Sequence, residues 1–368
     1  MCSARAMVLV DGVSPRTGTQ GPQSDAKFRD DRERKGIVCM LRVGILGAGY
    51  FGAVHARALS ALPEVQLVAV CAETEALADA FAAEHGGKPY GDWQAFLADS
   101  AVDAVAVAAP HQLHCEMAVA AAEAGKHVLL EKPMARTVAE CSRIIAAAER
   151  SGVTLMIGHL LHFSLPGLVA RRIIASGELG RPVLGSSALL KLWMEPNRRG
   201  WHLDAASGGG MLMTAGIHAL DLLIWLMGGQ VEAVSAATAK LFHAQAADDS
   251  SMLLLRFADG RFGQVASVGY RDGGTTYGMD LVCERGTLRI DFARGVAIGR
   301  DGCWSGVPGS IEPEWMLRGV EREWQAMAAA IAGTAPVAVT GAYGRHVIAC
   351  IEAAMASSRE RREVRVEA

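Results

Sequence analysis

Short apolar runs alternate with amphipathic segments through the first half of the chain. The strand-like runs are continuously apolar, which indicates strands buried on both faces. Strands are expected at Leu41–Leu46, Val65–Cys71, Ala104–Ala108, His127–Glu131 and Val153–Gly158, with helices at Tyr50–Leu62, Glu75–His85, His111–Ala124 and Thr137–Ser151. Repeated βα units of this kind predict an α/β domain over residues 40–158, built on a doubly wound parallel sheet.

The pattern changes after Gly158. Extended segments now dominate, and turn signals such as Asp259-Gly260 and Arg285-Gly286 separate them. The expected strands are Val183–Trp193, Val231–Lys240, Ser251–Phe257, Arg261–Gly269, Tyr277–Cys283 and Gly286–Asp291, and the expected helices are Pro166–Ser176, Met211–Met227, Glu321–Ala332 and Tyr343–Ser358. Residues 159–368 therefore predict an α+β domain with a large, mostly antiparallel sheet. Its last helix is expected to pack back on the first domain.

Composition narrows the class of protein. Residues 1–39 lack periodicity and predict a disordered leader, and Met40 is a candidate for the true start. The net charge of −3 offers no basic excess for nucleic acid, and no apolar run is long enough to span a membrane. The eight cysteines are scattered without a CxxC pair, so no metal site is indicated and a reducing cytoplasm is expected.

A glycine-rich turn follows the first strand directly. Gly47-Ala48-Gly49-Tyr50-Phe51-Gly52 has the G-x-G-x-x-G spacing and leads into a helix. In such a turn the first glycine permits the tight bend, the second lets the backbone approach a pyrophosphate, and the third lets helix and strand pack closely. The motif therefore predicts a dinucleotide site, the alternative being a glycine turn without a ligand.

Other groups at strand ends extend this prediction. Glu73 lies just beyond the second strand, where an acidic residue binds the ribose of NAD, and no Arg follows at once to receive the extra phosphate of NADP. This favours NAD and leaves NADP open. The segment Ala109-Pro110-His111 and then His114 follow the next strand, at the edge where open α/β sheets bind ligands. His114 is equally consistent with an ordinary first-turn helix residue.

Glu131-Lys132-Pro133 ends an otherwise apolar strand beside the predicted cofactor crevice. The chain has only 7 Lys against 29 Arg, and a lysine can exchange a proton where an arginine cannot. Pro133 restricts the backbone of Lys132 and can direct its amine over the crevice. The alternative is a solvent-facing loop lysine.

These residues, in this order and spacing, resemble the Gfo/Idh/MocA oxidoreductases. The resemblance covers about residue 40 to the C-terminus. Its carriers are the glycine turn with His55, Pro110 with His114, Glu131-Lys132-Pro133, Gly158-His159, Gly208-Gly209-Gly210, and Gly216-Ile217-His218 with Asp221. It implies a nicotinamide-dinucleotide domain, a second domain whose sheet forms a wall of the substrate cleft and often an oligomer interface, and substrates such as sugars, cyclic polyols and diols.

The resemblance makes Lys132 the expected catalytic residue, and the helical spacing adds His218 as a candidate general base. Met211, Thr214, His218 and Asp221 share one face of the expected helix. A neutral imidazole suits proton transfer near neutral pH, and an ammonium can stabilise a developing alkoxide. The expected cofactor contacts are Gly47, Gly49, Tyr50, Phe51, Gly52, Glu73, Ala109, Pro110, His111, His114, Glu131 and Lys132, and the expected substrate contacts are His159, Arg199, Trp201, Thr214 and Asp221.

Two departures from the family pattern leave questions open. Many family dehydrogenases have Asp where this chain has Thr214, and an Arg is frequent where this chain has His162. Part of the stretch with Arg199 and Trp201 resembles cis-dihydrodiol dehydrogenases of the same family. Arg199 as a solvated side chain and Trp201 as a core residue remain the alternative interpretation.

The leading hypothesis is an NAD(P)-dependent dehydrogenase or reductase acting on a sugar, cyclitol or cyclic diol, in a cytoplasmic homo-oligomer. Two alternatives remain open. One is a glycosidase or lyase that uses NAD transiently, and the other is a non-catalytic dinucleotide-binding regulator, which the missing Asp favours. The 340 nm absorbance of NADH separates all three.

Overall fold

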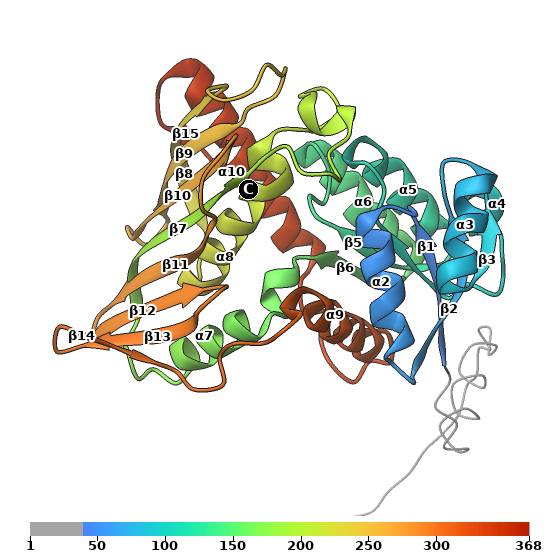
Figure 1. Cartoon of the computed structure of the whole chain (residues 1–368), viewed down its shortest axis with the longest axis horizontal. Coiled ribbons are helices and arrows are strands. Elements are labelled where there is room, and N and C mark those ends of the chain that lie inside the picture. Colours follow the sequence, from blue (N-terminus) through green and yellow to red (C-terminus); the bar gives the residue numbers. More distant parts are fainter. Residues whose placement is uncertain (1–39, 368) are drawn as a thin grey trace, which may run out of the picture. The chain divides into compact units, whose positions relative to one another are not determined.

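The computed structural model describes residues 40–367, so the expected leader at residues 1–39 lies outside the described residues. The first part of the chain forms a six-stranded parallel sheet in the order β3-β2-β1-β4-β5-β6 (Figure 1). Its strands are β1 (Leu41–Leu46), β2 (Val65–Cys71), β3 (Lys88–Tyr90), β4 (Ala104–Val107), β5 (His127–Glu131) and β6 (Leu155–Gly158). The order reverses between β1 and β4, as in a doubly wound fold. The predicted fold class of this part is confirmed.

Helices connect these strands. They are α2 (Tyr50–Ser60), α3 (Glu75–His85), α4 (Trp93–Leu97), α5 (His111–Glu123) and α6 (Val138–Ser151). α2 packs with α3, and α5 packs with α6. Because right-handed crossovers change direction at the β1–β4 reversal, these two pairs cover opposite faces of the sheet. The buried apolar strands between them explain why the sequence showed unbroken apolar runs.

The second sheet has nine strands in the order β14-β13-β12-β11-β7-β10-β9-β8-β15. They are β7 (Pro182–Leu192), β8 (Val231–Ala239), β9 (Ser250–Phe257), β10 (Phe262–Tyr270), β11 (Thr276–Cys283), β12 (Gly286–Asp291), β13 (Gly295–Arg300), β14 (Cys303–Gly306) and β15 (Val364–Arg365). Only β7 and β10 pair in parallel; the other neighbours in this sheet are antiparallel. This confirms the expected mostly antiparallel sheet.

Helices lie on one face of this sheet, as Figure 1 shows for α7, α8 and α10. The helical elements of this half are the 3-10 turns η1 (Leu160–His162) and η2 (Gly200–Leu203), the π-helical turn η3 (Leu212–Gly216), and α7 (Leu165–Ala175), α8 (Ile217–Met227), α9 (Trp315–Ile331) and α10 (Gly341–Glu360). The last two helices, α9 and α10, pack against helices of the first domain. α9 packs on α2, and α10 packs on α6 as well as on β8.

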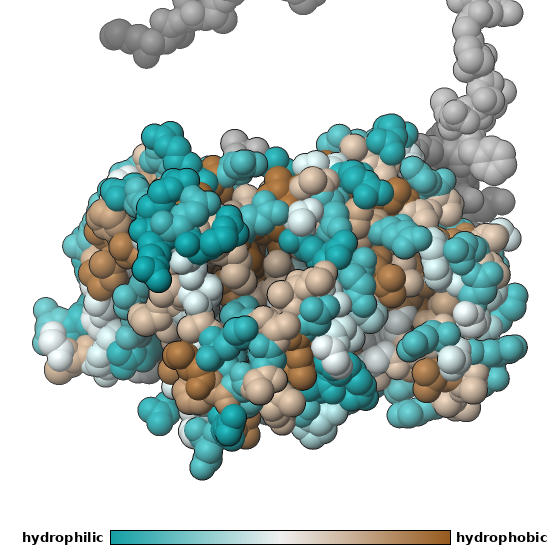
Figure 2. All heavy atoms as spheres, turned by 90° about the horizontal axis from the view of Figure 1, so that it is seen from above, coloured by the Kyte–Doolittle hydropathy of each residue, from teal (hydrophilic) through white to brown (hydrophobic). Residues whose placement is uncertain are grey.

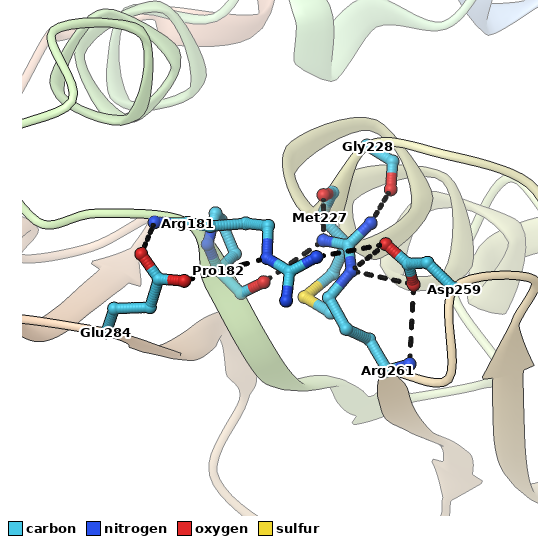
Figure 3. Close-up of polar contacts among 7 residues, drawn as sticks. All are labelled: Arg181, Pro182, Met227, Gly228, Asp259, Arg261 and Glu284. Carbon is cyan, nitrogen blue, oxygen red and sulfur yellow. Dashed lines mark hydrogen bonds and ion pairs between the residues drawn. The ribbon is translucent and has the colours of Figure 1, made fainter.

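An arginine in the turn between β9 and β10 bonds the C-terminal end of α8 (Figure 3). Arg261 is buried, and its guanidinium donates to the main-chain oxygens of Met227 at 2.6 Å, Gly228 at 2.6 Å and Pro182 at 3.0 Å. Its Nε donates to Asp259 at 2.7 Å. These bonds satisfy carbonyl groups that a helix end leaves open, and they add positive charge where the helix dipole is negative. α8 is therefore fixed relative to the sheet.

No helix within residues 40–367 is long and apolar enough to cross a bilayer. On the face seen in Figure 2, apolar side chains form small separate patches among hydrophilic ones.

Candidate functional site

The glycine turn between β1 and α2 has the local geometry of a dinucleotide cradle. Gly47 has a φ of +116°, and a Cβ there would lie 2.4 Å from the oxygen of Ala108. A Cβ on Gly52 would lie 2.0 Å from the oxygen of Gly47. At Gly49, by contrast, a Cβ would meet nothing within 4 Å. The first and third glycines are thus required by packing, whereas the second faces open space where a ligand can approach.

The helix that follows offers its first amide groups without a side-chain cap. Gly49 is the N-cap of α2 and supplies no side-chain acceptor, and no acidic residue stands in the first turn. Unpaired amides and the positive end of the helix dipole favour an anion such as a pyrophosphate. Tyr50 is exposed beside this turn, and the ring centroid of Phe51 lies 5.7 Å from Nζ of Lys132.

Glu73 is exposed just beyond β2, whereas Ala72 before it is buried. Thr74, the next residue, caps α3 by accepting a bond from the amide of Leu77 at 3.3 Å. Glu73 is therefore exposed just beyond the carboxyl end of β2.

The segment after β4 ties the two domains together. Pro110 is the N-cap residue of α5, and Nδ1 of His111 lies 2.7 Å from the oxygen of Gly208. The ring of His111 also meets that of Trp201 edge-on, with centroids 4.6 Å apart. His111 and Trp201 therefore form part of the contact between the cofactor domain and the segment before η3.

His114 lies between two main-chain oxygens of the cofactor domain. It is buried, with Nδ1 2.8 Å from the oxygen of Pro133 and Nε2 2.8 Å from the oxygen of Ala109. Burial lowers the pKa of His114, although these bonds oppose the shift. The ring thus links the end of β4 to the loop after β5 and has no nitrogen left for a ligand.

Lys132 reaches from the cofactor domain to the helix of the second domain. The peptide between Lys132 and Pro133 is cis, and Nζ of Lys132 donates to the main-chain oxygen of Thr214 at 3.2 Å. Burial lowers the pKa of Lys132 to about 8; Glu131 opposes this shift, and Arg198 and Lys191 reinforce it. A buried amine with a lowered pKa is typical of a functional site.

His218 faces the same region. Burial lowers the pKa of His218 well below 6.5, and the charge of Lys132 lowers it further. Its Nδ1 is buried and has no hydrogen-bond partner among the described residues. The side-chain oxygen of Thr214 is likewise buried without a partner in this part of the chain. The structure thus brings Lys132, Thr214 and His218 together.

The helix that carries these groups is not the regular helix expected over residues 211–227. The turn Leu212–Gly216 is π-helical, and α8 begins only at Ile217. π-helical turns are frequent at functional sites. Gly216 permits this close packing, because a Cβ there would lie 2.3 Å from Oγ of Ser267 on β10. The π-helical turn therefore interrupts the regular spacing expected from Thr214 to His218, whereas His218 and Asp221 both lie on α8.

Asp221 lies in a buried polar network next to this group. Nε2 of His162 is 2.9 Å from Oδ1 of Asp221, Nδ1 of His159 is 3.3 Å from Oδ2, and the Tyr343 hydroxyl donates to Oδ1 at 2.8 Å. Burial alone would raise the pKa of Asp221, but His159 and His162 lower it below its usual range. His162 stacks on Trp225 with centroids 4.1 Å apart. Asp221 is therefore engaged by protein groups.

Arg199 and Trp201 lie on the loop before η3. Arg199 is exposed, and its Nη1 donates to the main-chain oxygens of Pro196 and Arg198, within its own loop. Trp201 stacks on His202 with centroids 3.6 Å apart. Of these two expected substrate contacts, Trp201 lies at the domain contact and Arg199 is turned onto its own loop.

Sequence reasoning missed Lys191, Glu323 and Trp324. Lys191 shares the carboxylate of Glu195, at 2.7 Å, with Arg198, at 3.0 Å. Arg198 belongs to the stretch with Arg199 and Trp201 that the sequence had singled out for substrate binding. The scarcity of lysine was a usable signal for Lys191, which lies at the end of an apolar strand. Glu323 and Trp324 on α9 looked like ordinary residues of an amphipathic helix.

Family models match both halves of the chain. One, described as an oxidoreductase family with an NAD-binding Rossmann fold, matches residues 41–159, and one for the Gfo/Idh/MocA C-terminal domain matches residues 168–289. The chain belongs to the Gfo/Idh/MocA oxidoreductase family. The family binds NAD, and the open side of Gly49 with the uncapped start of α2 fits that cofactor.

Relatives and solved structures agree with this Gfo/Idh/MocA assignment. Inositol 2-dehydrogenase 1 of Saccharopolyspora erythraea is 31% identical over 277 residues, which is 71% of this chain and 80% of the relative. The 1-carboxy-3-chloro-3,4-dihydroxycyclohexa-1,5-diene dehydrogenase of Comamonas testosteroni is 32% identical over 248 residues, 67% of this chain and 62% of that enzyme. The crystal structure of GenD2 from gentamicin A biosynthesis, in complex with NAD, is 27% identical, with a TM-score of 0.79 and coverage of 97% of this chain and 100% of that one.

Proposed function

We propose that this protein transfers hydride between nicotinamide and a carbinol carbon of a sugar, cyclitol or cyclic diol. One observation carries the proposal: the amine of Lys132, from the cofactor domain, bonds the main-chain oxygen of Thr214 at 3.2 Å, on the helical segment that carries His218. An amine of the cofactor domain is thus bonded to the segment of the second domain that leads into the helix with the imidazole. Bound nicotinamide supplies the hydride acceptor or donor.

In this proposal His218 takes the proton of the substrate hydroxyl. Its imidazole is neutral at neutral pH, because burial and Lys132 lower its pKa, so it is ready to accept a proton. Lys132, as an ammonium, stabilises the negative charge that develops on the substrate oxygen. Thr214 contributes a hydroxyl without a partner, which is available to bind a substrate oxygen.

We propose NAD rather than NADP as the cofactor. Glu73 is exposed at the end of β2, where a carboxylate binds a ribose diol and repels a phosphate. The test is to titrate the protein with NADH and with NADPH and follow the nicotinamide fluorescence. Tighter binding of NADPH would contradict this choice.

The cations around Lys132 favour a substrate that carries an anionic group. Lys191 and Arg198 share one carboxylate, and both lower the pKa of Lys132. Arg198 is largely buried, stacked 4.1 Å over the ring of Trp193. The relative from Comamonas testosteroni is named for a carboxylated cyclic diol. A carboxylate on the substrate would balance this excess positive charge.

Turnover tests the proposed reaction. Production of NADH is followed at 340 nm with a panel of cyclitols, cyclic diols, and the pairs glucose with glucuronate and galactose with galacturonate. Net NADH supports an oxidoreductase, and a higher kcat/KM for the acids supports an anionic substrate. Product release without net NADH would instead support a lyase or glycosidase, and cofactor binding without any turnover would support a regulator.

Two variants test the roles of the residues. Lys132→Ala should lower kcat by about 10²-fold or more while NADH binding persists. His218→Ala should lose most activity near neutral pH. Lys88→Ala, a change at an exposed lysine on β3, is the matched control and should retain activity. Unchanged turnover of the Lys132 variant would refute its role.

We propose that the outer face of the nine-stranded sheet joins two copies of this chain. Five apolar side chains on neighbouring strands are 42% to 60% exposed there: Leu184, Met252, Leu254, Phe262 and Val282. Exposed apolar patches of this kind mark interfaces. Light scattering should give the mass of an oligomer for the native chain and a smaller mass for Leu254→Glu. Leu241→Glu, at an exposed position outside the strands, should not change the mass.

We further propose the cytoplasm as its compartment. The six cysteines of the described residues are free thiols, five of them buried, which suits a reducing environment. Fractionation of native cells, followed by immunoblotting, tests this location.

A further inference from the structure

A buried polar cluster includes Glu131, the residue before Lys132 in the chain. It consists of His55 on α2, Glu131 at the end of β5, and Glu323 with Trp324 on α9. All four side chains are buried. A nitrogen of His55 and one oxygen from each glutamate lie within 4.8 Å of one another. None of the roles proposed above uses Glu323 or Trp324.

Trp324 determines which nitrogen of His55 carries the proton. Nε1 of Trp324 lies 3.0 Å from Nδ1 of His55, and an indole nitrogen can only donate. Nδ1 must therefore accept, so the proton of His55 is on Nε2, which donates to Oε1 of Glu131 at 3.0 Å. A protonated ring would place an N–H against the indole N–H. His55 is consequently neutral and donates to Glu131.

The same constraint argues against a metal ion in the cluster. A metal bound to Nε2 of His55 would require the proton on Nδ1. Trp324 already donates to Nδ1, so that arrangement would set two donors against each other.

Glu131 receives two donors and Glu323 receives none. Besides His55, the main-chain amide of Lys132 donates to Oε2 of Glu131 at 3.2 Å. Both oxygens of Glu323 are buried without a hydrogen-bond partner among the described residues. Burial, and next the charge of Glu131, raise the pKa of Glu323 well above its usual range. Glu131 is therefore the better place for a negative charge, and a proton is favoured on Glu323.

We propose that Glu323 is a positioning residue and that only one of Glu131 and Glu323 is ionised at a time, so that the pair keeps a single negative charge near Lys132. This inference rests on the proposed role of Lys132. The charge can move to Glu323 when Glu131 cannot carry it, because the two carboxyl groups are close neighbours in one buried pocket. The pair thus keeps a negative charge near Lys132. This charge favours the ammonium form of Lys132, which burial and the neighbouring cations disfavour.

A neutral buried carboxyl has a direct spectroscopic signature. Infrared spectra of the full-length protein at pH 7 should show the C=O stretch of a protonated carboxylic acid, and this band should be absent from Glu323→Gln. It should also be absent from Glu131→Gln, because Glu323 then ionises and takes over the charge. Glu321→Gln, on the same helix but paired with Arg318 at 2.9 Å, is the control and should keep the band.

Persistence of the acid band in Glu131→Gln would overturn the proposal, since it would show that Glu323 stays protonated and cannot take the charge. A wild-type spectrum identical to that of Glu323→Gln would overturn it as well. Neither result depends on turnover, so this test remains valid if the proposed reaction is wrong.

The ionisation of Lys132 gives a second readout. Its reactivity toward acetic anhydride is followed against pH by mass spectrometry of the labelled peptide. Each single variant should keep the midpoint near that of the native chain, and Glu131→Gln with Glu323→Gln should lower it by about one pH unit or more. A midpoint that moves fully in Glu131→Gln alone would contradict a shared charge. Thermal melting and NADH binding verify that each variant is folded.

Discussion

Nζ of Lys132 lies 3.2 Å from the main-chain oxygen of Thr214, and this contact joins the end of β5 to the π-helical turn before α8. The amine therefore has a fixed position relative to His218 before any ligand arrives. A ligand that binds here meets the ammonium of Lys132 and the neutral imidazole of His218 in positions that are already fixed. Such prior placement reduces the reorganisation that accompanies the reaction.

The pH dependence of kcat/KM should follow Lys132 on its alkaline side. In the alcohol-oxidising direction, activity should fall with an apparent pKa near 8 as the ammonium loses its proton. It should stay level down to about pH 6, because the pKa of His218 lies well below 6.5. Lys132→Arg should remove the alkaline limb, since a guanidinium keeps its charge. An acid limb centred at 6.5 would contradict the environment described for His218.

Lys132 should also reduce the stability of the fold. Its pKa is about 8 in the folded chain against 10.5 as a free side chain, so below pH 8 the fold carries a buried charge that unfolding releases. Lys132→Met should therefore increase the free energy of unfolding at pH 7, by at most about 3 kcal/mol. Between pH 8 and 10.5 the unfolded chain binds more protons, so native stability rises with pH and the difference narrows. Thermal melting at pH 7 and pH 9.5 checks both signs.

Substitutions at two glycines of the cofactor turn should have different effects, one on NADH binding and the other on the stability of the fold. Gly49→Ala places a methyl group in open space at a φ of −88°, so the melting temperature should be unchanged while NADH affinity falls about tenfold or more. Gly52→Ala forces a Cβ to 2.0 Å from the oxygen of Gly47 and should destabilise the fold by about 2 kcal/mol or more. Normal NADH binding by Gly49→Ala would argue against a pyrophosphate at this turn.

Thr214→Val tests a hydroxyl that the protein leaves unused. Because Oγ1 of Thr214 is buried without a partner, its removal should leave the fold as stable or up to about 1 kcal/mol more stable. KM should rise with little change in kcat, as expected for a group that binds substrate. Thr137→Val is the contrasting variant. The hydroxyl of Thr137 caps α6 by accepting a hydrogen bond from the amide of Glu140 at 3.1 Å. Its removal should therefore lower the free energy of unfolding by about 1 kcal/mol.

Arg261→Met should weaken the anchoring of α8. The change leaves the carbonyl groups of Pro182, Met227 and Gly228 without their donor, and it should cost about 2 to 4 kcal/mol in urea denaturation. Arg300→Met, which removes an exposed ion pair with Glu178, should change stability by less than about 1 kcal/mol. Equal stability losses for the two variants would contradict the role given to Arg261.

The sequence predicted the long elements because burial leaves a strong periodic pattern in them. It missed β3, α4, β13, β14 and β15. β3, β14 and β15 contain no buried residue, so burial leaves no pattern in them. It placed Lys132 and His218 through motif and spacing, but it treated residues 211–227 as one regular helix. Gly216, at the end of the π-helical turn, packs closely against Ser267, a contact that spacing along the chain cannot reveal. Glu323 was missed for the same reason, because its neighbours come from α2 and β5.

Trp324 donates to His55 across 269 positions of the chain. The residue that orients His55 is therefore synthesised long after His55 itself. A nascent chain that has completed β6 already contains His55 and Glu131, but it lacks the helix that closes over them. The contacts of the cofactor domain with α9 can form only after translation has passed this helix.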